Sequence, residues 1–146
     1  MGRLKTLDDW LNWQETLHHQ AIDLGLARIQ TVYQKLFADG VPFKVITVAG
    51  TNGKGSTIAF IEHIYQQSSY KVAKFTSPHI VKYNERFLLN KVQATDVQII
   101  DAFEQIESVR GDTSLSYFEF STLAALLIFA KENVDIAILE IGLGGR

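Results

Sequence analysis

The sequence contains no cysteine, which excludes disulfide bonds and metal sites built on thiolates. Positive charge is not in excess either, because 14 basic residues stand against 16 acidic ones and the net charge is -2. Proteins that bind nucleic acid through its phosphates carry a basic surface. We therefore expect no nucleic acid as a partner, and any anion site must be local.

Long apolar segments are also missing. The longest apolar run, residues 123–130, is much shorter than the roughly 20 residues that a membrane-spanning helix needs. The N-terminus has no apolar core of signal-peptide length. We therefore expect a cytoplasmic protein without membrane contact. Its 146 residues, 47% of them hydrophobic, suffice for one domain with a substantial core.

Hydrophobic periodicity predicts alternating helices and strands in the first half of the chain. Apolar residues first recur at helical spacing, with Thr6 as a candidate cap, until Gly40 and Pro42 end the pattern. A continuously apolar strand follows, and the next helix leads into a second strand, as in a βαβ unit. The expected elements are helices at 4–17 and 22–36, a strand at 43–49, a helix at 56–67 and a strand at 70–75.

The second half begins with a long polar and aromatic stretch, residues 77–90, that has no clear period. We interpret it as a loop with a candidate hairpin at 87–92, and loops of this length are usually functional or disordered. Two capping boxes then open helices that reach about residues 109 and 130, and a third strand follows. These features are the boxes Thr95–Gln98 and Ser116–Glu119 and the strand 134–140.

This alternation predicts an α/β fold, a doubly wound layer with a mostly parallel sheet and with ligands at the carboxyl ends of its strands. We expect an N-terminal helical segment at 1–40 and a nucleotide-binding domain at 41–146. Three strands followed by a terminal glycine-rich loop make an incomplete domain. The chain is therefore expected to be a truncated piece of a longer protein.

The glycine-rich segment 50–56 lies between the first strand and its helix. Backbone N–H groups in such a turn, together with the positive end of the helix, bind phosphate, and glycines permit positive φ angles and a close approach. A common phosphate-binding loop has Gly where Val48 stands and Ser or Thr where Gly55 stands, so this loop is a variant. The alternative is a turn that merely links strand to helix. The candidate nucleotide-binding residues are Gly50, Thr51, Asn52, Gly53, Lys54, Gly55 and Ser56.

Acidic and hydroxyl side chains occur near the same predicted edge of the sheet. Glu140 ends the third strand and could serve Mg²⁺ or a water bound to it, or could simply be solvated. Ser77, after the second strand, could offer a hydroxyl or form an ordinary turn before Pro78. Four cations surround the long loop, either as solvated charges or to help hold anionic substrate groups. They are Lys71, Lys74, Lys82 and Arg86.

Five segments of the chain are familiar when taken in order, namely 50–56, 76–79, 85–86, 116–120 and 138–146. Together they resemble the folylpolyglutamate synthases of the Mur ligase superfamily. Residues 22–26, Ile-Asp-Leu-Gly-Leu, are more specifically similar to the bifunctional bacterial dihydrofolate synthase/folylpolyglutamate synthases. The resemblance implies the central, ATP-binding domain of a Mur ligase, preceded by helices.

The resemblance also assigns roles to individual residues. It explains Gly55, because in this family the metal-binding hydroxyl comes from the loop after the second strand. Tyr117 and Phe118 could enclose or stack on a flat pterin or aminobenzoate ring. The implied ligands of the ATP phosphates are Thr51, Asn52, Gly53 and Lys54, and those of Mg²⁺ are Ser77 and Glu140. The implied dihydropteroate-binding residues are Ile22, Asp23, Leu24, Ser116, Tyr117, Phe118 and Glu119.

The implied activity is ATP-dependent amide ligation, in which L-glutamate is added to dihydropteroate or to reduced folates through an acyl phosphate. Lys54 is the expected catalytic residue, because it would stabilise the transferring phosphoryl group. Full-length members of the family continue into further metal-binding residues and a C-terminal domain that receives glutamate. Because that part is absent here, we expect the chain to be inactive by itself.

Other functions stay open at this point. The enzyme could be a folylpolyglutamate synthase without dihydrofolate synthase activity. A P-loop kinase or GTPase would also use Lys54 and Glu140, although Gly55 and the segment 76–79 argue against that class. A non-catalytic nucleotide-binding module is a further alternative. The sequence does not show the oligomeric state, for which a monomer is the working expectation.

Overall fold

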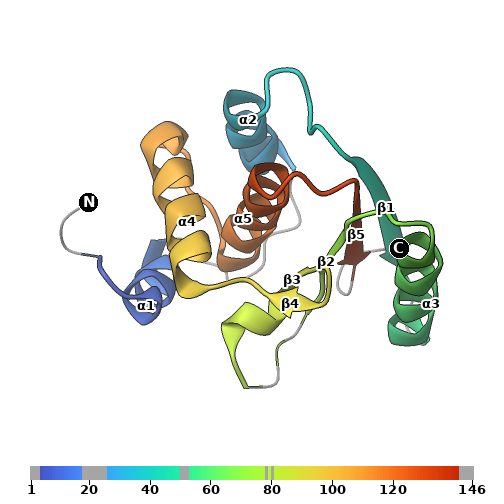
Figure 1. Cartoon of the computed structure of the whole chain (residues 1–146). Coiled ribbons are helices and arrows are strands. Elements are labelled where there is room, and N and C mark those ends of the chain that lie inside the picture. The colour runs from blue at the N-terminus through green and yellow to red at the C-terminus, as the bar shows by residue number, and fades with distance from the viewer. Residues whose placement is uncertain (1–3, 18–25, 50–52, 78, 80, 142–146) are drawn as a thin grey trace. The chain divides into compact units, whose positions relative to one another are not determined.

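The computed structural model describes residues 4–17, 26–49, 53–77, 79 and 81–141 (Figure 1). Contacts divide the chain into two compact units, Met1–Val41 with Thr95–Ile128, and Pro42–Ala94 with Phe129–Arg146. Each unit thus combines segments that are distant in the sequence. The division into a helical segment at 1–40 and a nucleotide-binding domain at 41–146 stays a prediction.

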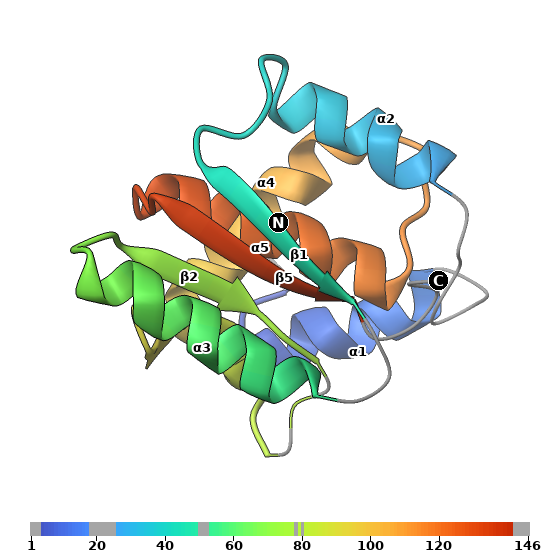
Figure 2. The ribbon, with the colours of Figure 1, turned by 90° about the vertical axis from the view of Figure 1, so that its right-hand side faces the viewer.

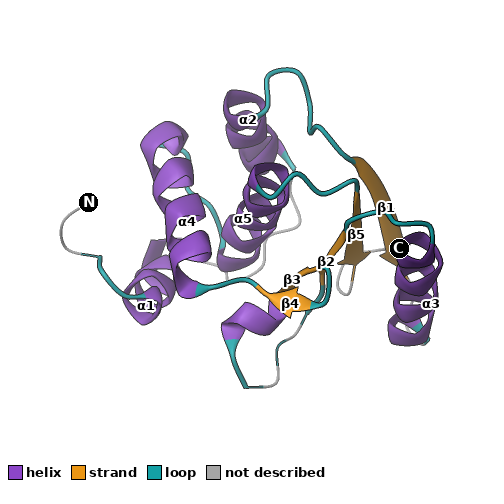
Figure 3. Ribbon diagram, viewed as in Figure 1, coloured by secondary structure: helices purple, strands orange, loops and turns teal. Residues whose placement is uncertain are grey.

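The described residues of the first unit form helices (Figure 3). Two of them begin with the predicted capping boxes, because Thr95 exchanges hydrogen bonds with Gln98 and Ser116 exchanges them with Glu119. Both boxes are therefore confirmed, and Thr6 Oγ1 also accepts from the N–H of Asp9 at the start of the first helix. The helices are α1 (Leu7–Leu17), α2 (Ala27–Leu36), α4 (Asp96–Arg110) and α5 (Tyr117–Lys131), whose last residues belong to the second unit.

Aromatic side chains from three helices form the core of the first unit. The ring of Trp10 on α1 lies 5.7 Å from that of Phe103 on α4, and Phe103 lies 5.7 Å from Phe120 on α5. Trp13 packs edge-on against both Trp10 and Phe120. Aromatic pairs at this separation stabilise a core beyond the area that they bury. This cluster holds the N-terminal turn of α5, where the candidate residues 116–119 lie.

The second unit is built on a five-stranded sheet in the order β1-β5-β2-β3-β4. The strands β1, β5 and β2 are parallel, whereas β2, β3 and β4 are antiparallel neighbours. The elements are β1 (Lys44–Ala49), α3 (Lys54–Gln67), β2 (Val72–Phe75), a 3-10 helix η1 (Tyr83–Arg86), β3 (Phe87–Leu89), β4 (Val92–Gln93) and β5 (Ile136–Ile141).

Helix α3 lies along the face of β1, β5 and β2 (Figure 2). Ile58 of the helix packs there against Val48, Val72 and Ile138 of the three strands. Burying a side chain of this kind stabilises the fold by about 1.5–3 kcal/mol. The packing holds the N-terminus of α3 near the carboxyl ends of the parallel strands.

The expected α/β alternation is confirmed element by element within the described residues. The hairpin expected at 87–92 is also present, as β3 and β4. The second strand begins at Val72 instead of residue 70, because Ser69 adopts a φ of 69° and turns the chain before the strand. Within the described ranges no helix has the length and apolar character needed to cross a membrane.

Candidate functional site

Three candidate residues of the second unit lie at one edge of its sheet. The parallel strands β1, β2 and β5 all end there, and Lys54 follows β1 as the first residue of α3. Ser77 follows β2, and Glu140 lies near the end of β5. The backbone N–H of Ser77 donates to Oε1 of Glu140 at 2.9 Å. The sheet thus brings together residues that the sequence places far apart, at the edge where parallel α/β sheets bind ligands.

Gly53 caps α3 with a φ of 76°, a left-handed conformation that favours glycine. The positive φ that we allowed for Gly55 is not used, because Gly55 lies inside the helix. No acidic side chain stands in the first turn of α3, so nothing there opposes the attraction of the helix N-terminus for an anion. Lys54 is half-buried in this turn, while Ser56 is exposed. This end of α3 has the polarity of a phosphate site.

Glu140 and Ser77 have the chemistry of ligands for a hard cation. Both side chains are half-buried, and the Ser77 N–H holds one oxygen of the carboxylate in place. Among the described residues, no group of three or more His, Cys, Asp and Glu side chains could hold a metal. A carboxylate and a hydroxyl suit Mg²⁺, which is usually bound by one or two protein ligands together with water and phosphate oxygens.

The described residues that follow Ser77 make several side-chain contacts. Nε of Arg86 donates to Nδ1 of His79 at 2.8 Å, so the neutral ring of His79 carries its proton on Nε2. Burial lowers the pKa of His79 below 6.5, and the positive charge of Arg86 lowers it further, while Glu85 opposes the shift. The carboxylate of Glu85 accepts the N–H groups of Val81 and Lys82. The predicted long loop is therefore in part a structured connection that follows the metal-ligand candidate.

The candidate acceptor residues of the first unit lie at the start of α5. Ser116 and Glu119 are buried, whereas Tyr117 and Phe118 are half-buried. Oε1 of Glu119 accepts the N–H of Ser116 at 2.9 Å, and Oε2 accepts Nη2 of Arg28 at 2.8 Å. Both carboxylate oxygens are thus engaged within the protein, and the aromatic pair is the more accessible part of the segment.

The chain is similar over nearly its whole length to known enzymes. It is 46% identical to the dihydrofolate synthase/folylpolyglutamate synthase of Escherichia coli and 44% identical to that of Haemophilus influenzae, in each case over 96% of this chain. It covers 33% and 32% of those relatives, so it spans about a third of their length. No protein-family model matches the chain.

Solved structures agree with these relatives. A structure of Escherichia coli FolC in complex with DHPP and ADP matches with a TM-score of 0.91 and 45% identity, over 97% of this chain and 34% of that one. The bifunctional enzyme from Yersinia pestis, complexed with AMPPNP and Mn, matches with a TM-score of 0.88 and 43% identity, over 97% and 35% of the two chains. The chain belongs to the dihydrofolate synthase/folylpolyglutamate synthase family. Its expected α/β fold of the Mur ligase type is confirmed.

Several predicted site residues lie outside the described residues. They include three of the seven residues of segment 50–56 and all three candidates before α2. The roles assigned to the described candidates stay predictions. The residues outside the description are Gly50, Thr51, Asn52, Ile22, Asp23 and Leu24.

Two of the four cations around the loop bind partners in other segments of the second unit. Nζ of Lys74 pairs with Oε1 of the buried Glu62 at 3.0 Å, between β2 and α3. Nζ of Lys71 donates to the carbonyl of Glu132 at 2.6 Å. These two lysines therefore have structural partners and are not simply solvated charges. A role in holding anionic substrate groups stays a prediction.

Sequence reasoning missed two charged residues of this chain. Glu62 and Arg28 lie at ordinary helix positions, and their partners are distant in the sequence. A signal for Arg28 was present: a cation in the first turn of a helix opposes the helix dipole. Such a residue should be examined for a carboxylate elsewhere in the fold.

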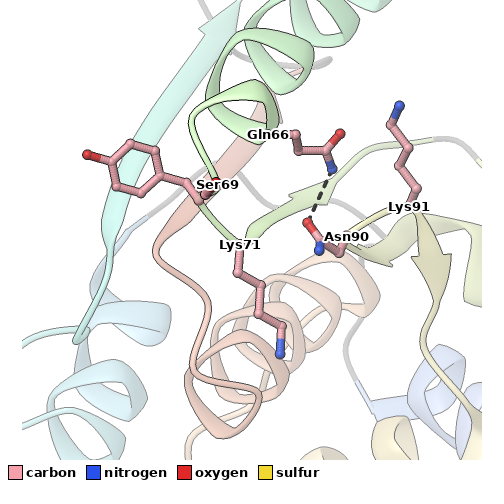
Figure 4. A pocket seen from close by; sticks show the side chains of 6 residues that line it. Gln66, Ser69, Lys71, Asn90 and Lys91 are labelled. Carbon is pink, nitrogen blue, oxygen red and sulfur yellow. Dashed lines mark hydrogen bonds between the residues drawn. The ribbon is translucent and has the colours of Figure 1, made fainter.

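A pocket of about 370 Å³ lies at the other edge of this unit's sheet (Figure 4). Tyr70 and Lys71 line it and precede β2, whereas Ser77 follows that strand. Asn90 closes one side by accepting Nε2 of Gln66 at 3.2 Å. Because α/β folds bind ligands at the carboxyl ends of their strands, this pocket is distinct from the candidate synthase site. Its lining residues are Gln66, Ser69, Tyr70, Lys71, Asn90 and Lys91.

Proposed function

We propose that this chain is part of an ATP-dependent ligase that adds L-glutamate to dihydropteroate and to reduced folates. The observation that carries the proposal is the placement of Lys54, Ser77 and Glu140 where the parallel strands of the sheet end, with the N–H of Ser77 hydrogen-bonded to Glu140. Relatives of this fold support it, because their structures contain DHPP with ADP, AMPPNP with Mn, and Mn, AMPPNP and L-glutamate together.

The chemistry requires activation of a carboxylate, which is a poor electrophile because its leaving group would be oxide. Bound ATP supplies the phosphoryl group that forms an acyl phosphate, and bound Mg²⁺ supplies charge neutralisation; glutamate then displaces phosphate. The proposed nucleotide-binding residues are Gly50, Thr51, Asn52, Gly53, Lys54, Gly55 and Ser56, and the proposed metal ligands are Ser77 and Glu140.

In this proposal the residues of the chain position groups and neutralise charge. Lys54 places a positive charge against the phosphates, and the first N–H groups of α3 orient them. Glu140 and Ser77 hold the cation, and the Ser77 N–H keeps the carboxylate in one orientation. None of these residues needs to become a covalent nucleophile.

The acceptor is proposed to bind the first unit. Tyr117 and Phe118 are half-buried and offer rings for a pterin or aminobenzoate. The residues Ile22, Asp23, Leu24, Ser116 and Glu119 complete the proposed site. Glu119 already binds Arg28 and Ser116, so its contribution is in part to hold the segment.

The remaining parts of the proposal concern the whole protein. The chain covers about a third of its relatives, so we propose that catalysis requires the rest of a full-length enzyme and that the chain alone is inactive. We also propose that this enzyme acts in the cytoplasm as a monomer.

The test measures phosphate release by the full-length protein that carries this chain, with and without dihydropteroate and L-glutamate. Release that requires both supports the ligase. Lys54→Ala should lower turnover by roughly a hundredfold or more while the protein stays folded, since the lysine serves the ligand. ATP consumption that does not depend on glutamate would favour a kinase or GTPase. Nucleotide binding without turnover would favour a non-catalytic module.

A further inference from the structure

Arg28 occupies a position that its own helix does not favour. It is the second residue of α2, in the first turn, where the positive end of the helix repels a cation. This helix has no acidic residue in its first turn and no side-chain cap on its N-terminus. Local preference therefore does not account for an arginine here, and its reason must be sought in tertiary contacts.

The tertiary partner of Arg28 is Glu119, which lies 91 positions later in the chain. Nη2 of Arg28 donates to Oε2 of Glu119 at 2.8 Å. The side chain of Glu119 is 5% exposed and that of Arg28 is 26% exposed, so the carboxylate is nearly removed from water. A buried carboxylate without a cation would be strongly disfavoured, and Arg28 supplies the compensating positive charge at 2.8 Å.

Glu119 links Arg28 to the start of α5. Its other oxygen accepts the N–H of Ser116, and Ser116 Oγ accepts the N–H of Glu119 at 3.2 Å. Arg28 thus holds both the carboxylate and the capping box of α5. Tyr117 and Phe118, both half-buried, stand between the two residues of that box in the sequence. Their orientation depends on a turn that Arg28 anchors to α2.

We propose that Arg28 is a positioning residue for the acceptor, an inference that rests on the proposed function. Acting through Glu119, it fixes residues 116–119 against the start of α2. It does not contact the substrate. Loss of this contact frees the aromatic residues to shift relative to the acceptor ring, and misplacement by a fraction of an ångström weakens recognition.

The experiment compares Arg28→Met and Arg28→Lys with the parent in the full-length protein. Lys35→Met is the matched control, because Lys35 is also a cation on α2 and donates to the carbonyl of Val109, an exposed contact away from Glu119. Steady-state kinetics give KM for dihydropteroate, KM for ATP and kcat, and thermal unfolding gives Tm.

We expect Arg28→Met to raise KM for dihydropteroate roughly tenfold or more, with KM for ATP nearly unchanged. Arg28→Lys should restore part of the affinity, because a shorter cation can still reach toward the carboxylate. Lys35→Met should match the parent. A purely structural role would instead lower Tm and the active fraction without a selective change in KM, and that result overturns the inference.

A further variant covers the case in which Arg28→Met fails to fold. The double variant Arg28→Met with Glu119→Gln removes both charges, so no uncompensated carboxylate is buried, and the Gln oxygen can still accept the Ser116 N–H. A raised KM for dihydropteroate in this folded protein supports positioning by the ion pair, and a parent-like KM refutes it. If the parent itself adds no glutamate to dihydropteroate, the proposed function is what has failed.

Discussion

The backbone N–H of Ser77 donates a hydrogen bond of 2.9 Å to Oε1 of Glu140, although the residues are 63 positions apart. The bond forms because β2 and β5 are parallel neighbours that end at the same edge. Glu140→Gln keeps an acceptor for this N–H but removes the charge that a hard cation prefers. We expect the Mg²⁺ concentration for half-maximal activity to rise roughly tenfold or more.

Ser77→Ala is the partner variant for the same Mg²⁺ titration. It removes the hydroxyl and keeps the N–H that holds Glu140, so the requirement for Mg²⁺ should rise less than in Glu140→Gln. Parent-like titration curves for both variants would refute the proposed metal site while leaving the phosphate site untouched.

The turn between β3 and β4 carries a strained lysine. Asn90 and Lys91 have φ angles of 52° and 73°, and positive values at both central residues define a type I′ hairpin turn. Asn suits the first position, whereas the second favours Gly and disfavours a side chain. Lys91→Gly should therefore raise the free energy of unfolding of the chain by up to about 1 kcal/mol, measured by urea unfolding.

Asn90→Gly is the control for that prediction. Glycine would also relieve the backbone strain of the positive φ at residue 90. However, Oδ1 of Asn90 accepts hydrogen bonds from both Nε2 of Gln66 and the N–H of Val72, each at 3.2 Å. Losing these bonds should cancel the backbone gain, so Asn90→Gly should be less stable than Lys91→Gly. The opposite ranking would show that backbone conformation does not decide the stability of this turn.

His79 should titrate below its ordinary pKa in the folded protein. Burial and then the charge of Arg86 lower its pKa below the ordinary 6.5. The folded state binds a proton on His79 less tightly than the unfolded state does. The neutral ring of His79 therefore contributes to stability in full above pH 6.5, and this contribution is lost as the pH falls through the folded pKa. Histidine NMR titration should show an upward shift of the pKa in Arg86→Gln. An unchanged titration would mean that Arg86 does not set it.

Phe118→Ala tests whether dihydropteroate and reduced folates bind differently. The ring is half-buried and offers apolar contact area worth about 25 cal/mol per Å², so its loss should weaken dihydropteroate binding by about 1–2 kcal/mol. The KM for ATP should change little. Glutamate addition is compared with dihydropteroate and tetrahydrofolate as acceptors, for the parent and the variant. A parent that uses only tetrahydrofolate would contradict the bifunctional assignment and leave the ligase proposal standing.

Local features of the sequence predicted most of the fold. The boxes at Thr95 and Ser116 could be recognised because a capping box joins residues three positions apart, and the helix and strand periods are equally local. The order of strand, glycine-rich loop and helix likewise predicted where Lys54 stands, since βαβ units place such a loop at the carboxyl end of the sheet.

Contacts between distant segments were decided only by the tertiary structure. Nothing local links Arg28 to Glu119, Lys74 to Glu62 or Ser77 to Glu140. Each pair depends on which helices and strands pack side by side. A charged residue on a helix has the same sequence spacing whether its side chain is solvated or contacts a buried carboxylate. The sequence by itself therefore determined the elements and the residue types available for a phosphate site. The tertiary structure decided which charges are paired, because a charged side chain needs a partner of opposite charge when it is buried, whatever its spacing in the sequence.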